Sequence, residues 1–287
     1  MIFSLTTFNV GLLEMFRGLY RPVPFVEQRL CALPEALLNS GSDVIALQEI
    51  YTDTHRDYLC SAVRRVYPFH APTQHRRVFG LENGLMTLSK MPISSDLELF
   101  HCALPDEKCF DNKGFLVSRL SLNANTEVLV LNLHTTAGGS ICHPESTRTD
   151  RVRAKQIAQI LDRAAQERTA SVIICGDVNA GPGVSEGNYN QFSEGGFMDV
   201  HEALHKPTPE PTWDPKNVLN QKGPHRTSPA QRVDHAFIRR QDLDAGRIRP
   251  LESVIQFKEE TVIVPGAKRV TLSDHYSLRA VFEIRSE

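Results

Sequence analysis

Eight polar side chains whose types suit metal binding and proton transfer recur along this 287-residue sequence, beside short apolar segments. Two are histidines, four are carboxylates and two are amides. They are Asn9, Glu49, His134, Asp177, Asn179, Asp234, Asp274 and His275. Carboxylate oxygens with few nitrogen ligands are typical of Mg²⁺ or Mn²⁺ sites, which keep several waters and complete their shell with substrate phosphate. Such a set predicts metal-assisted attack of water on a phosphate ester, with a histidine as base.

These residues need a scaffold that gathers them, and the apolar pattern supplies one. Alternation and β-branched content predict strands at Phe3–Asn9, Asp43–Gln48, Gly84–Ser89, Leu97–Cys102, Phe115–Leu122, Val128–His134, Ser171–Gly176, Val233–Arg239 and His275–Ile284. Helical periodicity predicts helices at Phe25–Asn39, Thr52–Val66 and Thr147–Glu167. The candidate residues lie mainly at the carboxyl ends of strands, where neighbouring strands converge on one rim. The proline-rich segment Lys206–Gln231 is expected to be a long loop.

Composition limits the class of protein. Hydrophobic residues make up 41% of the chain and charged residues 23%, as in ordinary globular proteins. The 32 basic and 34 acidic residues leave a formal charge of −2, which gives no overall attraction to a polyanion such as DNA. The six cysteines form no C-x-x-C pair, so we expect free thiols, with a small loop closed by Cys102 and Cys109 as the alternative. We expect one domain over residues 1–287.

The amino-terminal residues indicate where the chain works. They lack the basic region and cleavage site of a signal peptide, which predicts a cytoplasmic protein or export by a leaderless route. No apolar run approaches the roughly 20 residues that cross a bilayer. Any membrane contact is therefore expected to be peripheral, and no oligomeric state is predicted.

Seven phrases, taken in order, resemble the motifs of the endonuclease/exonuclease/phosphatase superfamily. They are TFNV (7–10), IALQEI (45–50), ENGLMTLSK (82–90), NLHT (132–135), CGDVNAGP (175–182), RVDHAFIR (232–239) and LSDHYSL (272–278). Each is weak alone, but their shared order over nearly the whole chain makes chance a poor explanation. The resemblance implies an α/β (α+β) fold in which a two-sheet β-sandwich is flanked by helices, with the four-layer architecture of deoxyribonuclease I.

The same resemblance implies a role for each candidate residue. Glu49 would be the main Mg²⁺ ligand, supported by Asn9 and with Asp274 nearby, and Mn²⁺ is the alternative ion. Asp177 and Asn179 would position the attacking water and the phosphate. His275 would be the general base, oriented by Asp234. His134 would donate to the phosphate oxygens, with Glu82 matching the acidic residue that orients this histidine in some relatives.

Three further segments resemble the neutral sphingomyelinase branch, whose members hydrolyse sphingomyelin to ceramide and phosphocholine. They are PTWDPKNVL (211–219), the pair Lys113–Gly114 and the helix TRTDRVRAKQIAQIL (147–161). Lys113, Trp213 and Asn217 are therefore candidate substrate-binding residues, and the expected partner is a phospholipid at a membrane surface. The T-W-D element also occurs in tyrosyl-DNA phosphodiesterases, and no regulatory switch is inferred at Lys113.

The apolar segment Leu12–Phe25 follows Asn9 and has two readings. If exposed, it would press on a membrane with Arg17 and Arg21 at lipid headgroups, and if buried it would cap the core.

Other functions stay open on the same catalytic set. A nuclease or DNA-repair phosphodiesterase is weakened by the near-neutral charge, and a phosphoinositide phosphatase is not excluded. A non-catalytic lipid- or protein-binding relative would be expected to have lost Glu49, Asp177, Asn179, Asp274 or His275, and all five are present.

Overall fold

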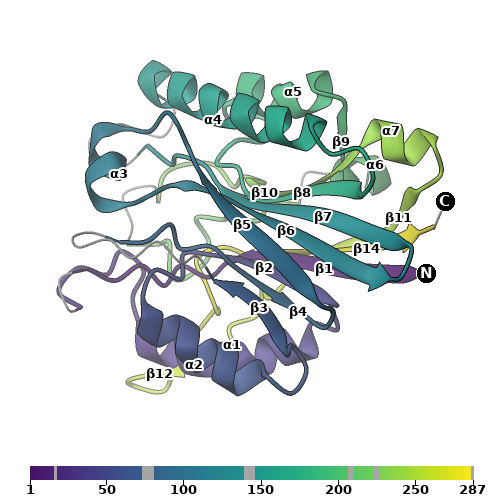
Figure 1. Cartoon of the computed structure of the whole chain (residues 1–287). Helices are drawn as coiled ribbons and strands as arrows, with labels where there is room; N and C mark the ends of the chain where they lie inside the picture. Colours follow the sequence, from purple (N-terminus) through teal and green to yellow (C-terminus); the bar gives the residue numbers. More distant parts are fainter. Residues whose placement is uncertain (16–17, 73–80, 139–145, 206–209, 223–225, 286–287) are drawn as a thin grey trace.

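A computed structural model describes the chain except residues 16–17, 73–80, 139–145, 206–209, 223–225 and 286–287. Two six-stranded sheets lie face to face, and helices cover their outer surfaces (Figure 1). This arrangement confirms the predicted two-sheet sandwich flanked by helices. Across the described residues, no helix has the length and apolarity that a membrane span requires.

The first sheet is built around two parallel strands. In sheet order it contains β11 (Ile248–Gln256), β14 (Ser277–Ile284), β1 (Ile2–Asn9), β2 (Val44–Gln48), β4 (Met86–Ser89) and β3 (Phe69–Pro72). Strand β1 runs parallel to β2 and antiparallel to β14, which joins the beginning of the chain to a strand close to its end.

The second sheet has the same plan, with the parallel pair β7 and β8 at its centre. In sheet order it contains β5 (Ile93–Leu99), β6 (Gly114–Asn123), β7 (Thr126–His134), β8 (Ser171–Asp177), β10 (Asp234–Arg239) and β9 (Phe197–Asp199). A separate hairpin pairs β12 (Val262–Val264) with β13 (Lys268–Val270).

The sheets pack through an apolar layer to which both contribute. Its members include Phe3, Leu5, Val44, Ala46, Val130, Ile173, Ala236, Ile238 and Phe282, all buried. Strands β2 and β8 are buried along their whole length, because one face meets the other sheet and the opposite face meets helices. Their sequences are accordingly continuous apolar runs rather than alternating ones.

Helices complete the outer layers. Helices α1 (Val26–Asn39) and α2 (Asp53–Val63) pack on the first sheet, and α4 (Thr147–Ala165) and α5 (Glu186–Glu194) pack on the second (Figure 1). Side chains cap two of them, since Thr52 accepts a hydrogen bond from His55 N and Ser146 accepts one from Thr149 N. The short helices are α3 (Pro105–Phe110), α6 (Val200–Leu204) and α7 (Arg240–Asp244).

Most predicted elements are present, with one strand misplaced. The segment Leu97–Cys102 was expected to be a strand, but β5 spans Ile93–Leu99 and the chain then turns toward α3. Strands β3, β9, β11, β12 and β13 and the four short or polar helices α3, α5, α6 and α7 were not predicted. The described part of the predicted loop Lys206–Gln231 is anchored by backbone hydrogen bonds between Trp213 and Gln231.

Candidate active site

Parallel strands bring the candidate residues to one edge of the sandwich. Asn9 ends β1 and Glu49 follows β2, while His134 ends β7 and Asp177 ends β8. In the second sheet, Asp177 is in register with His134 on one side and with Asp234 on the other. The strand ends therefore place groups from distant parts of the sequence in one pocket.

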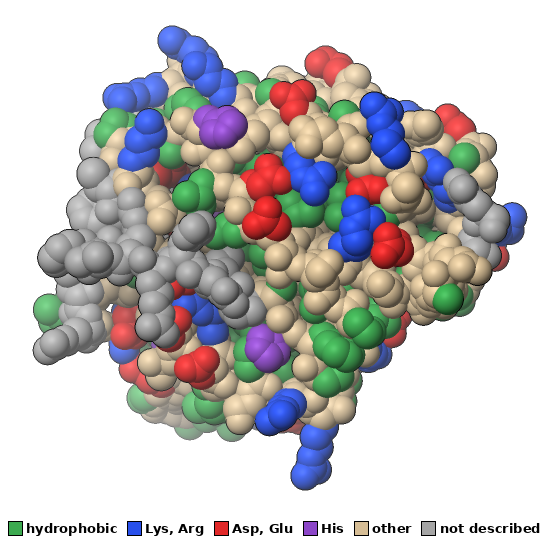
Figure 2. All heavy atoms as spheres, viewed as in Figure 1, with side chains coloured by type: hydrophobic (Ala, Val, Ile, Leu, Met, Phe, Trp, Pro, Cys, Tyr) green, Lys and Arg blue, Asp and Glu red, His purple; other side chains and the backbone are tan. Residues whose placement is uncertain are grey.

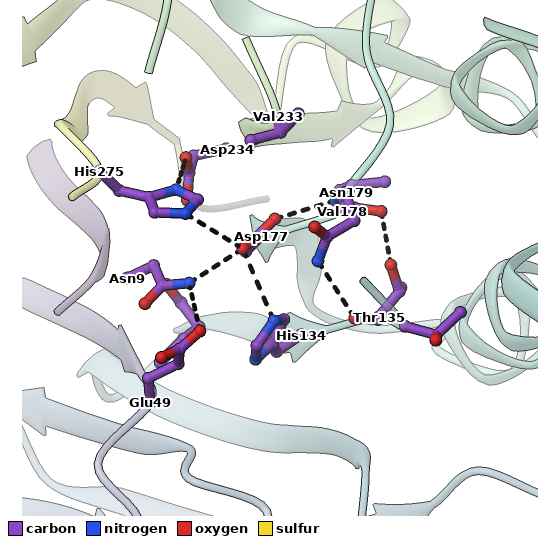
Figure 3. Close-up of polar contacts among 12 residues, drawn as sticks. Asn9, Glu49, His134, Thr135, Asp177, Val178, Asn179, Val233, Asp234 and His275 are labelled. Carbon is purple, nitrogen blue, oxygen red and sulfur yellow. Dashed lines mark hydrogen bonds and ion pairs between the residues drawn. The ribbon is translucent and has the colours of Figure 1, made fainter. Parts of the chain in front are cut away.

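Asp177 lies at the centre of this pocket (Figure 3). The side-chain amide of Asn9 donates to Asp177 Oδ2 at 2.9 Å and to Glu49 Oε1 at 3.1 Å, which links the two sheets. The Nε2 atoms of His134 and His275 lie 3.6 and 3.9 Å from the same Asp177 oxygen. The side-chain oxygen of Asn9 accepts from the backbone of Gly11, so its predicted ligand role stays a prediction.

Two pocket residues have a left-handed backbone. Glu49 has a φ of 63° and Asn179 a φ of 51°, a conformation that costs an L-residue roughly 1–2 kcal/mol. At Asn179 the turn is held by its backbone N–H, which donates to Asp177 Oδ1 at 2.9 Å, and by its side chain, which donates to Thr135 O at 3.2 Å. Backbone strain at these positions is typical of functional sites.

His275 and Asp234 form a hydrogen-bonded pair. His275 Nδ1 lies 2.9 Å from Asp234 Oδ2, and the Asp234 backbone N–H donates to Thr212 Oγ1. Burial lowers the pKa of His275, but Asp234 and Asp177 raise it more, so the pKa lies well above its usual value. The pair fixes the ring so that Nε2 faces the pocket, as a general base requires.

His134 has the opposite electrostatic character. Burial lowers its pKa well below the usual value, and the positive charge of Lys113 adds to the effect. Its Nδ1 atom is buried without a hydrogen-bond partner among the described residues. The expected contact from Glu82 is therefore corrected, since Glu82 forms an ion pair with Arg56 at 2.9 Å. A neutral His134 can carry its proton on Nε2, toward the pocket.

Lys113 brings a buried cation to the same region. Its Nζ atom lies 3.6 Å from Asp111 Oδ2 and 3.4 Å from Thr135 O. Burial lowers the pKa of Lys113, but Asp111, Glu107 and Glu49 raise it more, so the net pKa is raised. The side chain thus stays protonated at neutral pH and its charge acts on the pocket carboxylates.

The negative charges of the pocket carboxylates exceed the positive charges of the side chains around them. Burial, and then the neighbouring charge of Asp274, raise the pKa of Glu49 to about 7. Burial and Asp234 raise the pKa of Asp177 to about 6. Both shifts have the direction expected of buried carboxylates that repel one another, an arrangement whose charge a divalent cation would offset. The ligand atoms of Asp177, Asp234 and His275 also lie within 4.8 Å of one another.

The predicted substrate-binding residues have different fates. Trp213 is half-buried and pairs through its backbone with His275 at the pocket edge. Asn217 is buried, and its side chain is occupied by Ser273 O, Thr271 Oγ1 and Leu219 N. The amide of Asn217 holds the turn before Asp274, and its role in binding substrate stays a prediction.

Three buried residues that support the pocket were not predicted. Gln48 Nε2 donates to Asn132 Oδ1 at 2.8 Å across the sheets, and Asn132 Nδ2 donates to two backbone carbonyls of the opposite sheet. Each amide interrupts an apolar strand shortly before Glu49 or His134. A polar residue at such a position in the sequence could have indicated that it supports the pocket. Arg29 is also buried, and nothing in the pattern of its helix distinguishes it from a surface arginine.

Residues 6–275 match the Endonuclease/Exonuclease/phosphatase family, and the chain belongs to this family. Among curated relatives, the Phospholipase C of Staphylococcus aureus is 25% identical over 216 residues. That match covers 69% of this chain and 62% of the relative, so it spans less than two thirds of the relative's length.

Solved structures share the fold across the whole chain. The beta toxin of Staphylococcus aureus matches with a TM-score of 0.79 and 20% identity, covering 99% of this chain and 100% of that one. Sphingomyelinase C from Streptomyces griseocarneus matches with a TM-score of 0.76 and 22% identity, covering 98% and 99%. TDP2 from D. rerio, complexed with a single-strand DNA product, matches with a TM-score of 0.69 and 18% identity, again covering 98% and 99%. The architecture is thus the deoxyribonuclease I-like sandwich that the resemblance implied.

Proposed function

We propose that this protein is a Mg²⁺-dependent phosphodiesterase that hydrolyses sphingomyelin to ceramide and phosphocholine. The observation that carries the hydrolase part is the His275–Asp234 pair facing Asp177 beside the Glu49 carboxylate. The choice of sphingomyelin is supported by the similarity to a Phospholipase C and to a Sphingomyelinase C.

Glu49 and Asp274 are the proposed metal ligands, with Asn9 holding Glu49 in place. Their mutual repulsion, which contributes to the raised pKa of Glu49, fits a cation between them. The group of Asp177, Asp234 and His275 is a weaker candidate, because Asp234 is already bonded to the imidazole. A bound Mg²⁺, or Mn²⁺ in its place, would supply positive charge next to the substrate phosphate. A beta toxin double mutant of Staphylococcus aureus is a structural relative with bound magnesium ions.

The protein groups then divide the remaining work. A bound cation would offset the carboxylate charges that raise the pKa of His275 and so favour its neutral form. The neutral His275 Nε2 then accepts the proton of the attacking water, while Asp234 keeps the Nδ1 proton in place and stabilises the imidazolium. Asp177 and Asn179 orient the water and the phosphate, and His134 donates its Nε2–H to a phosphate oxygen. A new P–O bond forms to water as the P–O bond to the ceramide oxygen breaks, and the departing ceramide oxygen takes up a proton from solvent water. The charged Lys113 offsets charge on the phosphate oxygens.

Phosphocholine release from sphingomyelin vesicles, with MgCl₂ and after EDTA, tests this function. Release that needs MgCl₂ and is lost in the His275→Ala variant is expected. The panel includes lysophospholipids, phosphoinositides and DNA. Turnover of another phosphodiester without sphingomyelin cleavage would remove the substrate claim and keep the reaction class, whereas activity equal to that of His275→Ala on every substrate would remove both.

Hydrolysis of a DNA phosphodiester is the second candidate, favoured by the fold shared with TDP2. Against it, acidic and basic side chains are interspersed over most of the face shown in Figure 2, and the formal net charge is −2. A DNA backbone is better matched by a continuous basic surface. The DNA arm of the substrate panel separates the two functions.

We further propose that the protein reaches its lipid as a peripheral enzyme through Leu19 and Tyr20. Within Leu12–Phe25, Leu12 and Val23 are buried in the core, whereas Leu19 is 90% exposed and Tyr20 is 48% exposed. Arg21 forms ion pairs with Glu14 and Glu27 and is partly exposed, so its contact with lipid headgroups stays a prediction. Phe16 and Arg17 lie outside the described residues.

A further inference from the structure

Arg29 in helix α1 is fully buried, and all five of its N–H donors point at backbone carbonyls. The acceptors are Pro24 O (2.9 Å), Val10 O (2.8 Å), Leu272 O (3.1 Å), Gly11 O (2.6 Å) and Val23 O (3.5 Å). A guanidinium that uses its whole fork in this way fixes the relative positions of every segment it contacts.

The segments it joins are those that carry proposed metal-site residues. Val10 and Gly11 directly follow Asn9, and Leu272 lies two residues before Asp274. Ser273 makes the same connection from the other side, since its hydroxyl donates to Asn9 O at 2.7 Å. Arg29 and Ser273 therefore form a clasp between the end of β1 and the turn before β14.

The two segments joined by the clasp are packed so closely at Gly11 that no side chain fits there. Gly11 has a φ of +56°, and a Cβ atom there would lie 2.3 Å from Asp274 Oδ1. The backbone of the first segment thus touches the carboxylate of the second. A small shift of either segment would change where the Asp274 carboxylate lies.

Arg29 also remains charged in this setting. Burial lowers its pKa to about 10, against the raising effect of Asp274 and Glu49. Because all five acceptors are uncharged carbonyls, no carboxylate neutralises it by direct hydrogen bonding. Arg29 can therefore affect the site in two ways, through its positive charge and through its hydrogen bonds. A test must keep the charge and change the hydrogen bonds.

We propose that the Arg29–Ser273 clasp positions a ligand of the divalent cation. The clasp holds Asp274 at the distance from Glu49 that gives the site its affinity for Mg²⁺. Arg29 donates to backbone carbonyls and Ser273 Oγ lies 3.0 Å from Asp274 Oδ1, so both residues would act on the cation through the position of Asp274. This inference rests on the proposed function in that Glu49 and Asp274 are taken as the ligands. It gives a role to two residues to which the family resemblance assigned none, Arg29 outside the matched phrases and Ser273 within LSDHYSL.

The decisive variant is Arg29→Lys, which keeps the positive charge and removes the fork. Arg239→Lys is the control, because Arg239 is also buried, donates to Glu167 O and Ala170 O as well as to the Asp242 carboxylate, and lies at the opposite end of its strand from Asp234. MgCl₂ binding to each EDTA-treated full chain is measured by calorimetry, and Tm is measured alongside. Arg29→Lys is expected to weaken Mg²⁺ binding about tenfold, the usual lower effect of losing a partner of a metal ligand. Turnover should recover to within about threefold at saturating MgCl₂.

Unchanged Mg²⁺ affinity in Arg29→Lys would overturn the proposal. An equal loss of Mg²⁺ affinity in Arg239→Lys would also overturn it, because it would mean that any buried arginine acts through general stability. If Arg29→Lys does not fold, Ser273→Ala decides, with a several-fold weaker Kd expected and native affinity contradicting the clasp. Absence of Mg²⁺ binding by the native chain would remove the proposed metal function and this inference together. Binding without sphingomyelin turnover would remove only the substrate.

Discussion

At the residue scale, three groups of the pocket have pKa values moved in the direction that excess negative charge imposes. Glu49 and Asp177 hold their protons to about pH 7 and 6, and His275 holds its proton well above the usual pKa. Burial opposes the shift at His275 but reinforces it at the carboxyls, so the shared cause is the carboxylate cluster itself. The excess negative charge of the pocket favours binding of a cation. The same side chains far from one another would keep pKa values closer to their ordinary ones.

Replacement of Asp234 by Asn should separate orientation from proton affinity. The Asn side chain can no longer hold the Nδ1 proton as an anion does, so kcat should fall about 100- to 10,000-fold with a small change in KM. Asp234 raises the pKa of His275, so its loss should move the acidic limb of the pH–rate profile to lower pH. Steady-state kinetics from pH 5 to 9 on a soluble phosphodiester would measure both. A limb that moved to higher pH would contradict the assigned pair.

Glu49→Gln should weaken the metal site and stabilise the metal-free fold. The raised pKa of Glu49 means that ionisation of this carboxyl opposes folding, increasingly from its ordinary pKa of 4.5 up to about 7. Gln cannot ionise, so the metal-free variant should be more stable by roughly 1 kcal/mol at pH 8 and equal to the native chain near pH 4. Urea unfolding after EDTA treatment, with Asp274→Asn as the companion variant, would check this. A variant less stable at pH 8 would argue against repulsion at this position.

At the element scale, the strands explain why sequence motifs found so much of the pocket. Central strands are continuous apolar runs that end in a polar residue, as in Ser171–Asp177, and this pattern can be read without a structure. The edge strand β11 was missed because Pro250, a bulge between Pro250 and Glu252, and alternating exposure disguise it. Arg29 and Asn217 could not be placed, because only packing reveals whether a polar side chain faces water or a carbonyl. The single domain and the residue roles stay predictions.

Glu167 offers a test of how α4 is joined to β8. Its carboxylate accepts hydrogen bonds from the backbone N–H groups of Thr169 and Ala170 and pairs with Arg119. Burial raises the pKa of Glu167, but these hydrogen bonds lower it more, to about 2. The stability that it contributes is present above its ordinary pKa of 4.5 and is lost as pH falls toward 2. Glu167→Gln should therefore cost about 2 kcal/mol at pH 7, and the difference should shrink below pH 4.5.

Glu127→Gln is the matched control for that measurement. Glu127 pairs with the same Arg119 at 2.8 Å, but it is 41% exposed and bonded on the surface. Its loss should cost no more than about 0.5 kcal/mol at any pH, because exposed ion pairs contribute little. Equal costs for both variants in urea unfolding at pH 7 and pH 3 would show that Arg119 pairing, and not the backbone bonds, accounts for the effect.

At the scale of the whole molecule, the pocket and the exposed Leu19–Tyr20 pair are connected by the segment that follows β1. Replacing both residues by Ser should reduce binding to sphingomyelin-containing vesicles about tenfold, while hydrolysis of a soluble phosphodiester stays unchanged, because the catalytic groups are untouched. Leu204→Ser, on helix α6, is the control with a partly exposed leucine of its own. Vesicle sedimentation with His275→Ala chains isolates binding from turnover. Unaltered sedimentation of the double variant would exclude this contact.

The pairing of β1 with β14 has a consequence for biosynthesis. A ribosome produces residues 2–9 some 270 residues before residues 277–284, yet these two strands are neighbours in the sheet. Until then the growing polypeptide keeps one edge of β1 unpaired and lacks His275, the proposed base, so translation intermediates are exposed to aberrant strand pairing. The proposed site can therefore be completed only after residues 274–284 have been synthesised.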